Sequence, residues 1–417
     1  KVPPTQLDAV LLSHAHIDHS GNLPNLVKHG YQGPIYTTRA TASLAEVMLL
    51  DAGYIQEADA QFINKRRAKR GEPLIEPLYT QEDAARVLPL LRPTEYYKKF
   101  EVVPGVNVEF LEAGHILGSA AMNLKIQEGG RTTRFWFSGD IGRPGLPIVR
   151  DPILPADVDY LMMECTYGDT RHDDPQLSHE KFGQVVKETI NRGGKVIIPA
   201  FAVGRTQDLV FTLNQLISDK YIPPIPVYVD SPLAVQASQV FIKHPECYDS
   251  ETNTFIREER HPALTFPGLT YIGSVDESKA LNGKNEPMVI ISASGMAEVG
   301  RILHHLKNNI EDSNNTILIV SWQAPGTLGR RLVEGQPQVR IFGEEYPVRA
   351  RVVNIGGLSA HAGQDMLLKY ALSATEHTRG LFLVHGEPDA ASTFRSLLID
   401  KGVTNIYYPA ENESVDL

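Results

Sequence analysis

The stretch Ser13-His14-Ala15-His16-Ile17-Asp18-His19-Ser20-Gly21 places three imidazoles and one carboxylate within six positions. It follows the apolar run 9–12, which is short enough to form one buried strand. On a loop leaving that strand, alternation directs His14 and His16 to one side and leaves Asp18 and His19 to face a second point. A lone histidine would carry little meaning, but burying so many polar rings and a charge is costly without a cation. The residue types fit zinc, which binds imidazole nitrogen together with some carboxylate oxygen.

Length and composition set the broad class of the protein. A chain of 417 residues predicts two or three domains, and 42% hydrophobic with 22% charged residues is typical of water-soluble globular proteins. No apolar run approaches the ~20 residues of a membrane-spanning helix, and no signal peptide is visible, so we expect no membrane association. The two cysteines, Cys165 and Cys247, lie far apart and are expected to be packing residues in a reducing cytoplasm.

The net charge of −10 gives no overall positive field that would recruit nucleic acid. A polyanion would therefore have to be held locally, by a groove, by metal or by helix N-termini. The one dense basic run, residues 65–70, is more typical of a solvated helix face than of a contact with a nucleic-acid backbone.

The arrangement of predicted strands indicates an α/β domain interrupted by a second, inserted domain. From about residue 170 the chain alternates between continuous apolar strands and amphipathic helices, which predicts a parallel sheet covered on both faces. These strands are expected at 195–199, 226–229, 288–292 and 316–320, and the helices at 178–191, 204–218, 233–243 and 297–308. The strands at 352–355 and 381–384 resemble those before residue 170, because they too end near candidate site residues, His361 and His385. We therefore expect domains at 1–168 and 351–417 (the two parts of one domain) and at 169–350.

Polar residues follow several strands of the interrupted domain, where α/β folds keep their reacting groups. Two metal ions can be shared among them, with Asp140 as the bridge between two sets. The first set is His14, His16 and His115, and the second is Asp18, His19 and His385. Two Zn²⁺ with two carboxylates and a hydroxide leave a net positive site that attracts a phosphodiester. A single closed structural zinc site would use only four ligands and would prefer cysteine.

With these residues in place, the sequence resembles the metallo-β-lactamase fold, and the residues after Asp140 resemble the β-CASP nucleases. Glu164 in Met163-Glu164-Cys165-Thr166-Tyr167-Gly168 resembles motif A of that family. His361 in 358–362 resembles motif B, and His385 in 384–386 resembles motif C. The resemblance implies an αββα sandwich with an inserted β-CASP cap of parallel sheet and flanking helices. It is closest to the group related to the endonuclease subunit of the cleavage-and-polyadenylation specificity factor.

The front of the chain departs from the family pattern. Members carry further strands and an Asp-containing first motif before the metal loop, whereas this chain reaches the loop almost at once from Lys1. We therefore expect an N-terminally incomplete fold in which the opening strands are missing. The missing Asp is generally supportive and not a ligand, so the ligand assignment is unaffected.

The resemblance implies zinc-dependent hydrolysis of single-stranded RNA that leaves a 5′-phosphate and a 3′-hydroxyl. Asp140, Glu164 and His361 would carry the chemistry, with His361 binding the scissile phosphate or protonating the leaving oxygen; the alternative for His361 is a structural role. His at 385 favours RNA over the DNA-repair branch, and the segment 358–361 favours endonuclease over 5′-exonuclease action. The rival functions are a small-molecule metallo-hydrolase and an inactive RNA-binding subunit.

Contacts to the RNA backbone are predicted for five residues of the insert and its end. They are Ser292, Gly295, Arg301, Ser359 and, as a weaker candidate, Arg205. Gly295 would let the main chain approach a phosphate, and a helix starting near Ala297 would direct free N–H groups at it. An ordinary strand-to-helix turn and a solvent-facing arginine are the competing interpretations. The sequence does not decide between a monomer and a homodimer.

Overall fold

The computed structural model describes residues 2–172, 174–259, 261–374, 378–411, 413–415 and 417. Within them the chain forms two compact units. The first unit comprises Lys1–Pro144, Asp151–Arg171 and His361–Leu417, and the second comprises Gly145–Arg150 and His172–Ala360. None of the described helices is both long enough and apolar enough to cross a membrane.

The unit boundaries differ from the predicted division at 168 and 351. Residues 351–360 belong to the second unit, because β16 (Arg351–Asn354) pairs in parallel with β13 (Thr316–Ile319). The segment Gly145–Arg150 also joins the second unit, where Val149 forms a β-bridge with Tyr248. The predicted return to the first domain at 352–355 therefore comes too early, since a short apolar strand fits either sheet by its composition.

The first unit contains two sheets. A seven-stranded sheet has the order β18-β17-β8-β7-β6-β5-β4, and a parallel three-stranded sheet has the order β1-β2-β3. The strands of the large sheet are β4 (Phe100–Val103), β5 (Val106–Glu112), β6 (Ala120–Glu128), β7 (Arg131–Phe137), β8 (Tyr160–Glu164), β17 (Gly380–Val384) and β18 (Ile406–Tyr407). Those of the small sheet are β1 (Val10–Leu11), β2 (Ile35–Thr38) and β3 (Leu91–Thr94).

Each face of the large sheet has its own hydrophobic core. On one face, α12 (Gln364–Ala374) and α13 (Pro388–Asp400) pack on the strands through residues such as Leu367 and Phe394. On the other face, Phe110 and Met122 pack with Leu11 and Tyr36 of the small sheet. Burial on both faces explains why the strands are rich in apolar residues, and this layering agrees with the predicted α/β sandwich.

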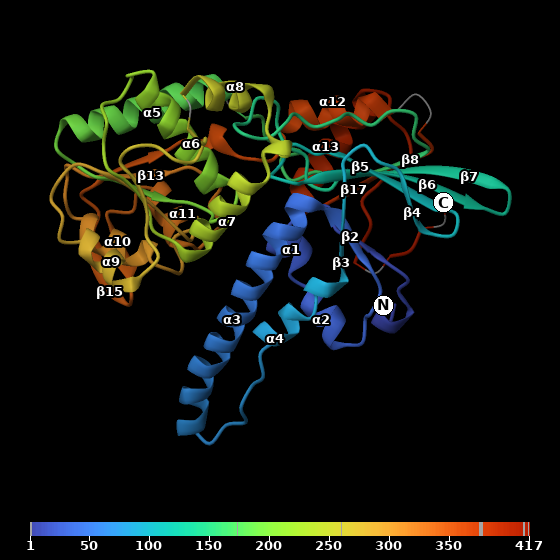
Figure 1. Ribbon diagram of the computed structural model, residues 1–417, viewed down its shortest axis with the longest axis horizontal. Coiled ribbons are helices and arrows are strands. Elements are labelled where there is room, and N and C mark those ends of the chain that lie inside the picture. Colours follow the sequence, from blue (N-terminus) through green and yellow to red (C-terminus); the bar gives the residue numbers. More distant parts are fainter. Residues whose placement is uncertain (1, 173, 260, 375–377, 412, 416) are drawn as a thin grey trace. The chain divides into compact units, whose positions relative to one another are not determined.

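The chain after the histidine-rich loop forms two short helices instead of one continuous helix. The structure has α1 (Ile17–Ser20) and α2 (Leu23–Lys28), with Pro24 in the first turn of α2. Proline has no N–H and cannot continue a preceding helix, so a new helix begins there. The next helix, α3 (Arg39–Lys69), is capped by Thr38, whose hydroxyl accepts a hydrogen bond from the Thr41 amide. Figure 1 shows α3 as a long arm with α4 (Gln81–Ala85) beside it.

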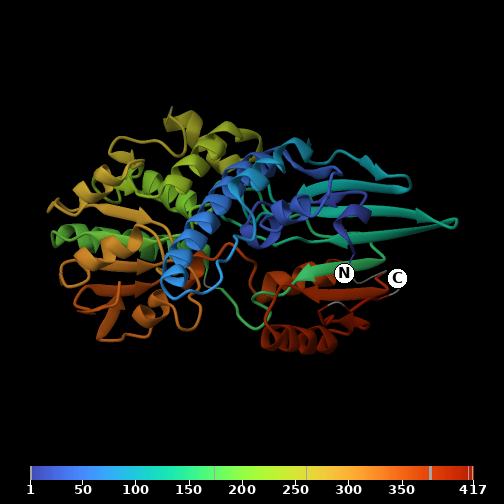
Figure 2. The same cartoon turned by 90° about the horizontal axis from the view of Figure 1, so that it is seen from below.

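The second unit is a six-stranded parallel sheet with flanking helices, as the strand–helix alternation predicts (Figure 2). Its strand order is β11-β10-β12-β9-β13-β16, and β14 and β15 form a separate hairpin. The remaining strands are β9 (Val196–Pro199), β10 (Val227–Val229), β11 (Leu269–Tyr271), β12 (Val289–Ser292), β14 (Gln338–Ile341) and β15 (Glu344–Pro347). The helices are α5 (Pro175–Asn191), α6 (Arg205–Ser218), α7 (Pro232–Lys243), α8 (Ser250–Glu259), α9 (Val275–Leu281), α10 (Ile302–Asn309) and α11 (Leu328–Val333).

One predicted helix of the second unit starts later than expected. The pattern predicts a helix over 297–308, but α10 begins at Ile302. Ala297 has a positive φ of 57° and Gly300 one of 87°, so the chain between them is not helical. Consequently, no helix N-terminus lies at Ala297 to bind a phosphate.

Candidate metal centre

The large sheet brings four chemically important residues to one edge. β5, β7, β8 and β17 all run in the same direction, because β5 and β7 flank the antiparallel β6, and β8 and β17 continue in parallel from β7. Their carboxyl ends lead directly to His115, Asp140, Glu164 and His385. The register pairs Val384 with Glu164, which fixes where the last two of these residues meet.

The histidine-rich loop reaches this edge from the small sheet. His14 follows β1, and His16 is the residue immediately before α1. Gly139, directly before Asp140, has a positive φ of 57°, and a Cβ at this position would lie 2.9 Å from Cβ of Ser13. Glycine at this position therefore lets the two loops pack closely enough for their side chains to meet.

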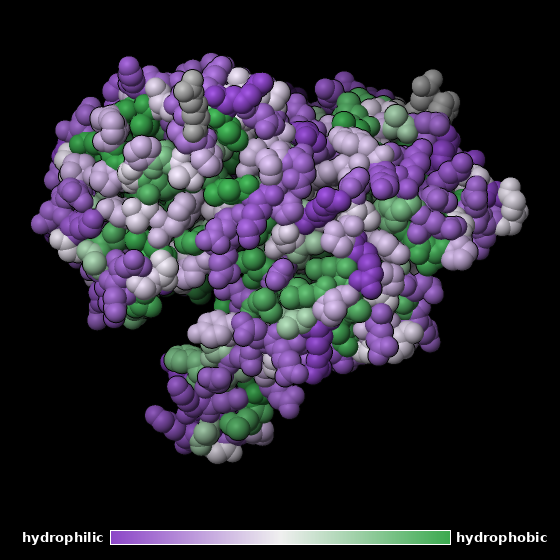
Figure 3. Space-filling view, viewed as in Figure 1, coloured by the Kyte–Doolittle hydropathy of each residue, from purple (hydrophilic) through white to green (hydrophobic). Residues whose placement is uncertain are grey.

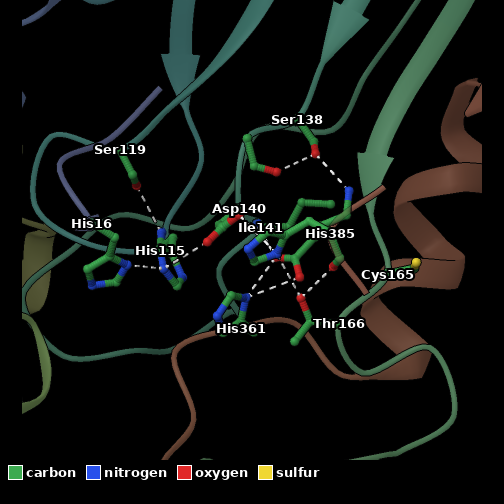
Figure 4. A network of polar contacts seen from close by, with 12 residues as sticks. His16, His115, Ser119, Ser138, Asp140, Ile141, Cys165, Thr166, His361 and His385 are labelled. Carbon is green, nitrogen blue, oxygen red and sulfur yellow. Dashed lines mark hydrogen bonds and ion pairs between the residues drawn. The ribbon is translucent and has the colours of Figure 1, made fainter. Parts of the chain in front are cut away.

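The first predicted ligand set converges on one point. Figure 4 shows His16, His115 and Asp140 of this group. His16 Nδ1 lies 3.2 Å from His14 Nε2 and 3.1 Å from His115 Nε2. Asp140 Oδ2 lies 3.4 Å from His14 Nε2 and 3.5 Å from His115 Nε2. His14, His115 and Asp140 are buried.

The second predicted set is more open. His19 Nε2 lies 3.2 Å from Asp140 Oδ1 and 3.8 Å from Asp18 Oδ2. His385 lies between the two carboxylates, with Nε2 3.3 Å from Asp18 Oδ2 and Nδ1 3.5 Å from Asp140 Oδ1. The hydrogen bond with Asp18 raises the pKa of His385 to about 9 in the metal-free protein. The two oxygens of Asp140 thus face different sets, which is the arrangement a bridging carboxylate requires.

These spacings fit a divalent cation. At Zn–N and Zn–O distances of about 2.0–2.2 Å, tetrahedral ligand atoms lie roughly 3.3–3.6 Å apart, close to the separations in the first set. Asp140 Oδ1 and His19 Nε2 are buried and face each other at 3.2 Å, but they do not meet the geometry of a hydrogen bond. Buried polar atoms normally make well-formed hydrogen bonds, so an ion held between these two atoms would satisfy both.

Protonation favours ligation at the first set. Burial lowers the pKa of His16 to about 4 and holds the pKa values of His14 and His115 well below the usual histidine range. These rings are therefore neutral near pH 7 and offer lone pairs. Burial alone would raise the pKa of Asp140, but the close contact with His19 and the neighbouring imidazoles outweigh it and hold that pKa well below its ordinary value.

Buried Glu164 and partly exposed His361 form a pair next to the ligands. Both oxygens of Glu164 lie 3.1 Å from His361 Nδ1, and Oε1 also accepts a hydrogen bond of 2.5 Å from the Ile141 amide. Burial lowers the pKa of His361. The charge of Glu164 and its hydrogen bond with His361 raise this pKa by a larger amount, so the net shift is upward. The His361 and His115 rings are 4.5 Å apart between centroids. With Nδ1 held by Glu164, His361 lies at the edge of the ligand cluster and has Nε2 free of that pair.

Thr166 is a residue that the sequence analysis did not single out. Its hydroxyl donates to the His385 carbonyl oxygen at 2.9 Å and lies 3.2 Å from His385 Nδ1 (Figure 4). His385 has a positive φ of 48°, an unfavourable conformation for histidine, so it needs such support. The available signal was a hydroxyl two residues beyond Glu164 at the end of a strand, which by itself is common.

Thr166→Val is expected to weaken metal binding by about 10- to 100-fold, since residues that orient metal ligands typically contribute this much. Valine keeps the volume but removes both contacts to His385. Titration of the metal-free protein with zinc against a competing chromophoric chelator measures the affinity. Thr166→Ser should restore it, and a valine variant with wild-type affinity would show that Thr166 does not position His385.

Two of the predicted RNA contacts are used inside the second unit. Ser292 is buried, and its hydroxyl donates to the Asp230 carbonyl oxygen at 2.8 Å. Arg301 donates to Asp230 Oδ1 at 2.7 Å and to the Gly273 carbonyl oxygen at 3.1 Å. The carboxylate of Asp230 is fully buried, and its ion pairs with Arg301 and with His305, at 2.7 and 2.6 Å, offset a charge that would otherwise be costly. The Ser292 hydroxyl and the Arg301 guanidinium are therefore engaged inside the second unit, and their contacts with RNA stay predictions.

The other three predicted contacts are also buried. Arg205 is buried and pairs with Asp208 at 3.2 Å, and its contact with RNA stays a prediction. The Gly295 carbonyl oxygen accepts a hydrogen bond of 3.0 Å from Gln323. Ser359 has 8% of its surface exposed. A small or polar residue can occupy either an exposed or a buried loop, and the hydrophobic periodicity of the sequence does not distinguish the two.

Comparison with protein families covers nearly the whole chain. The family model of the metallo-beta-lactamase superfamily matches residues 1–199, and that of the Beta-Casp domain matches residues 206–332. A third model, the Zn-dependent metallo-hydrolase RNA specificity domain, matches residues 345–409. Together they follow the order that the sequence analysis expects.

Individual relatives resemble the chain along most of its length. Ribonuclease TTHA0252 of Thermus thermophilus is 36% identical over 96% of this chain and 86% of its own length. An RNase J-like protein of Methanocaldococcus jannaschii is 30% identical over 93% and 83%, respectively. The transcription termination factor FttA of Methanosarcina mazei is 30% identical over 97% of this chain, which spans only 63% of that longer protein.

Proposed function

The chain belongs to the β-CASP ribonucleases of the metallo-β-lactamase superfamily, which are metal-dependent hydrolases, and we propose that it cleaves single-stranded RNA internally with two zinc ions. The products would carry a 5′-phosphate and a 3′-hydroxyl. The fold family and the Zn-dependent RNA specificity domain support RNA as the substrate. Internal cleavage and the zinc pair are the parts that this proposal adds.

One observation carries the proposal of a metal pair. Asp140 directs one oxygen to His14 and His115 and the other to His19 and His385, at 3.2–3.5 Å in each case. The seven candidate ligands therefore form two sets that share one carboxylate. A single structural ion would leave half of these groups without a partner.

Two divalent cations held by these residues would supply hydroxide near neutral pH and offset the charge of the phosphodiester. Hydrolysis that leaves a 5′-phosphate breaks the bond between phosphorus and the 3′-oxygen, and that oxygen then needs a proton. His361 can supply it from Nε2, because Glu164 holds Nδ1 and stabilises the imidazolium. Glu164 is itself fixed by the Ile141 amide, so the donor is held in one orientation.

Cleavage of a circular single-stranded RNA tests the proposal directly. A circle has no 5′ end, so an endonuclease opens it and a 5′-exonuclease leaves it intact. We expect linear products with 5′-phosphate and 3′-hydroxyl ends, visible by gel electrophoresis and by ligation, and no cleavage after treatment with a chelator. Degradation of linear RNA alone would support the exonuclease alternative. Hydrolysis of a lactam or thioester without any RNA cleavage would contradict the proposal.

A further inference from the structure

The outer half of α3 is built as an exposed arm. The helix has 31 residues and is therefore about 46 Å long. All but one of its buried residues lie in the first half, up to Gly53, and Ala60 is the single buried residue of the second half. The returning segment 71–79 is attached to the helix by paired hydrogen bonds of 2.9 Å between Asn64 and Ile75. The arm is thus a fixed structure and not a loose loop.

The end of the arm carries a concentrated positive charge, which we call the basic tip. It consists of Lys65, Arg66, Arg67, Lys69 and Arg70. Glu72 lies 3.4 Å from Arg67 and 3.9 Å from Arg70, and in the described chain no carboxylate lies within ion-pair distance of the other three. This concentration stands out in a chain whose net charge is −10.

Aromatic side chains accompany the charge. The Arg66 guanidinium lies over the Phe62 ring, 4.5 Å from its centroid, and 56% of Phe62 is exposed. Tyr54, two turns nearer the sheets, is 62% exposed. Figure 3 shows hydrophobic and hydrophilic side chains next to one another on the arm. Positive charge beside exposed aromatic rings is the combination that binds single-stranded nucleic acids without sequence preference.

The opposite end of α3 packs against the metal centre. The hydroxyls of Thr38 and Thr41 donate to the Gly118 carbonyl oxygen at 2.7 and 2.8 Å, three residues after the candidate ligand His115. Gly118 has a positive φ of 82°, and a Cβ there would lie 2.5 Å from the Thr41 amide nitrogen. The helix therefore links the metal loop at one end with the basic tip at the other.

We propose that the arm binds the RNA strand that flanks the cleavage site, with the basic tip on its phosphates and Phe62 stacked on a base. This inference rests on the proposed function, because it assigns a further contact to the same substrate. At ~3.4 Å per stacked nucleotide, the length of α3 corresponds to about 14 nucleotides between the cleavage site and the tip. The arm should therefore matter for long RNAs and not for short ones.

Replacing Lys65, Arg66 and Lys69 together with alanine tests the inference. Substrates are oligouridines of 8 and 30 nucleotides, and binding is followed by stopped-flow fluorescence anisotropy, which detects binding before cleavage. For the 30-mer we expect affinity to fall about 10- to 100-fold near 0.1 M salt, and the slope of log K against log salt to shrink by roughly 2. Binding and cleavage of the 8-mer should be unchanged. The matched control replaces Lys369, Arg395 and Lys401, three exposed cations on or beside α12 and α13, and should behave as wild type.

A second variant, Phe62→Leu, removes the ring without changing the charge. It should weaken binding of the 30-mer by about 5- to 150-fold if one base stacks there. The inference is overturned if both tip variants bind the 30-mer as wild type does. It is also overturned if the tip variants change only the oligomeric state in size-exclusion chromatography, which would identify a protein interface. Absence of cleavage by the wild-type protein contradicts the proposed function, whereas length-dependent binding through the tip would still support the arm.

Discussion

Asp140→Ala is expected to lower the rate of RNA cleavage by roughly 10³- to 10⁵-fold and to empty both metal positions. Each oxygen of this buried carboxylate faces one ligand set, at 3.2 Å from His19 and 3.4 Å from His14. Loss of this carboxylate removes one negative charge from the site, and it removes one ligand atom from each of the two sets. The charge stabilisation that a catalytic ion supplies is worth several kcal/mol, which corresponds to the stated rate factor.

Metal content after dialysis, measured by mass spectrometry, and initial rates on a labelled RNA check this prediction. Circular dichroism confirms that the variant is folded. Asp365→Ala is the matched control, since Asp365 is an exposed carboxylate at the start of α12 in the same unit. An Asp140 variant that retains two ions per chain would show that this residue does not hold the pair together.

His361→Ala is expected to keep both metal ions and to lose about 10²- to 10⁴-fold in kcat, the usual contribution of a positioned general acid. The pKa of His361 is raised by Glu164 despite burial, so the ring is a donor near neutral pH. Its removal leaves the ligand atoms of the two sets in place.

Comparing substrates with different leaving groups shows whether His361 donates a proton or only supports the fold. A phosphodiester that releases p-nitrophenolate needs no proton on the leaving oxygen, so the variant should lose far less activity on it than on RNA. Equal losses on both substrates, or loss of metal from the variant, would contradict the assigned role. His361→Ala and Glu164→Gln should also resemble each other on RNA, because both remove the held donor.

Metal ligands are easier to predict from a sequence than RNA contacts, for a physical reason. Imidazoles and carboxylates at the ends of strands have few explanations other than catalysis or metal, and the parallel strands β7, β8 and β17 bring their ends to one edge. Ser292 and Arg205, by contrast, have side chains that serve equally well on a surface or in a buried network. Only the packing around Asp230 and Asp208 distinguishes these two uses.

The sequence pattern also did not predict the exact domain boundary or the position of the basic residues 65–70. A four-residue apolar strand such as β16 fits either sheet, and its pairing with β13 assigns it to the second unit. The helical character of residues 65–70 was expected, but their position at the end of a 31-residue helix depends on how little of the outer half of α3 is buried. Thr166 was missed because a single hydroxyl gains meaning only from the distance to His385.

The most direct test of the account is X-ray diffraction from crystals of the intact protein, recorded just above and just below the zinc absorption edge. We predict two anomalous peaks per chain, one beside His14, His16 and His115 and one beside Asp18, His19 and His385, with the Asp140 carboxylate between them. A single peak, or two peaks that share no ligand, would contradict the claim that these distant segments form one dinuclear centre.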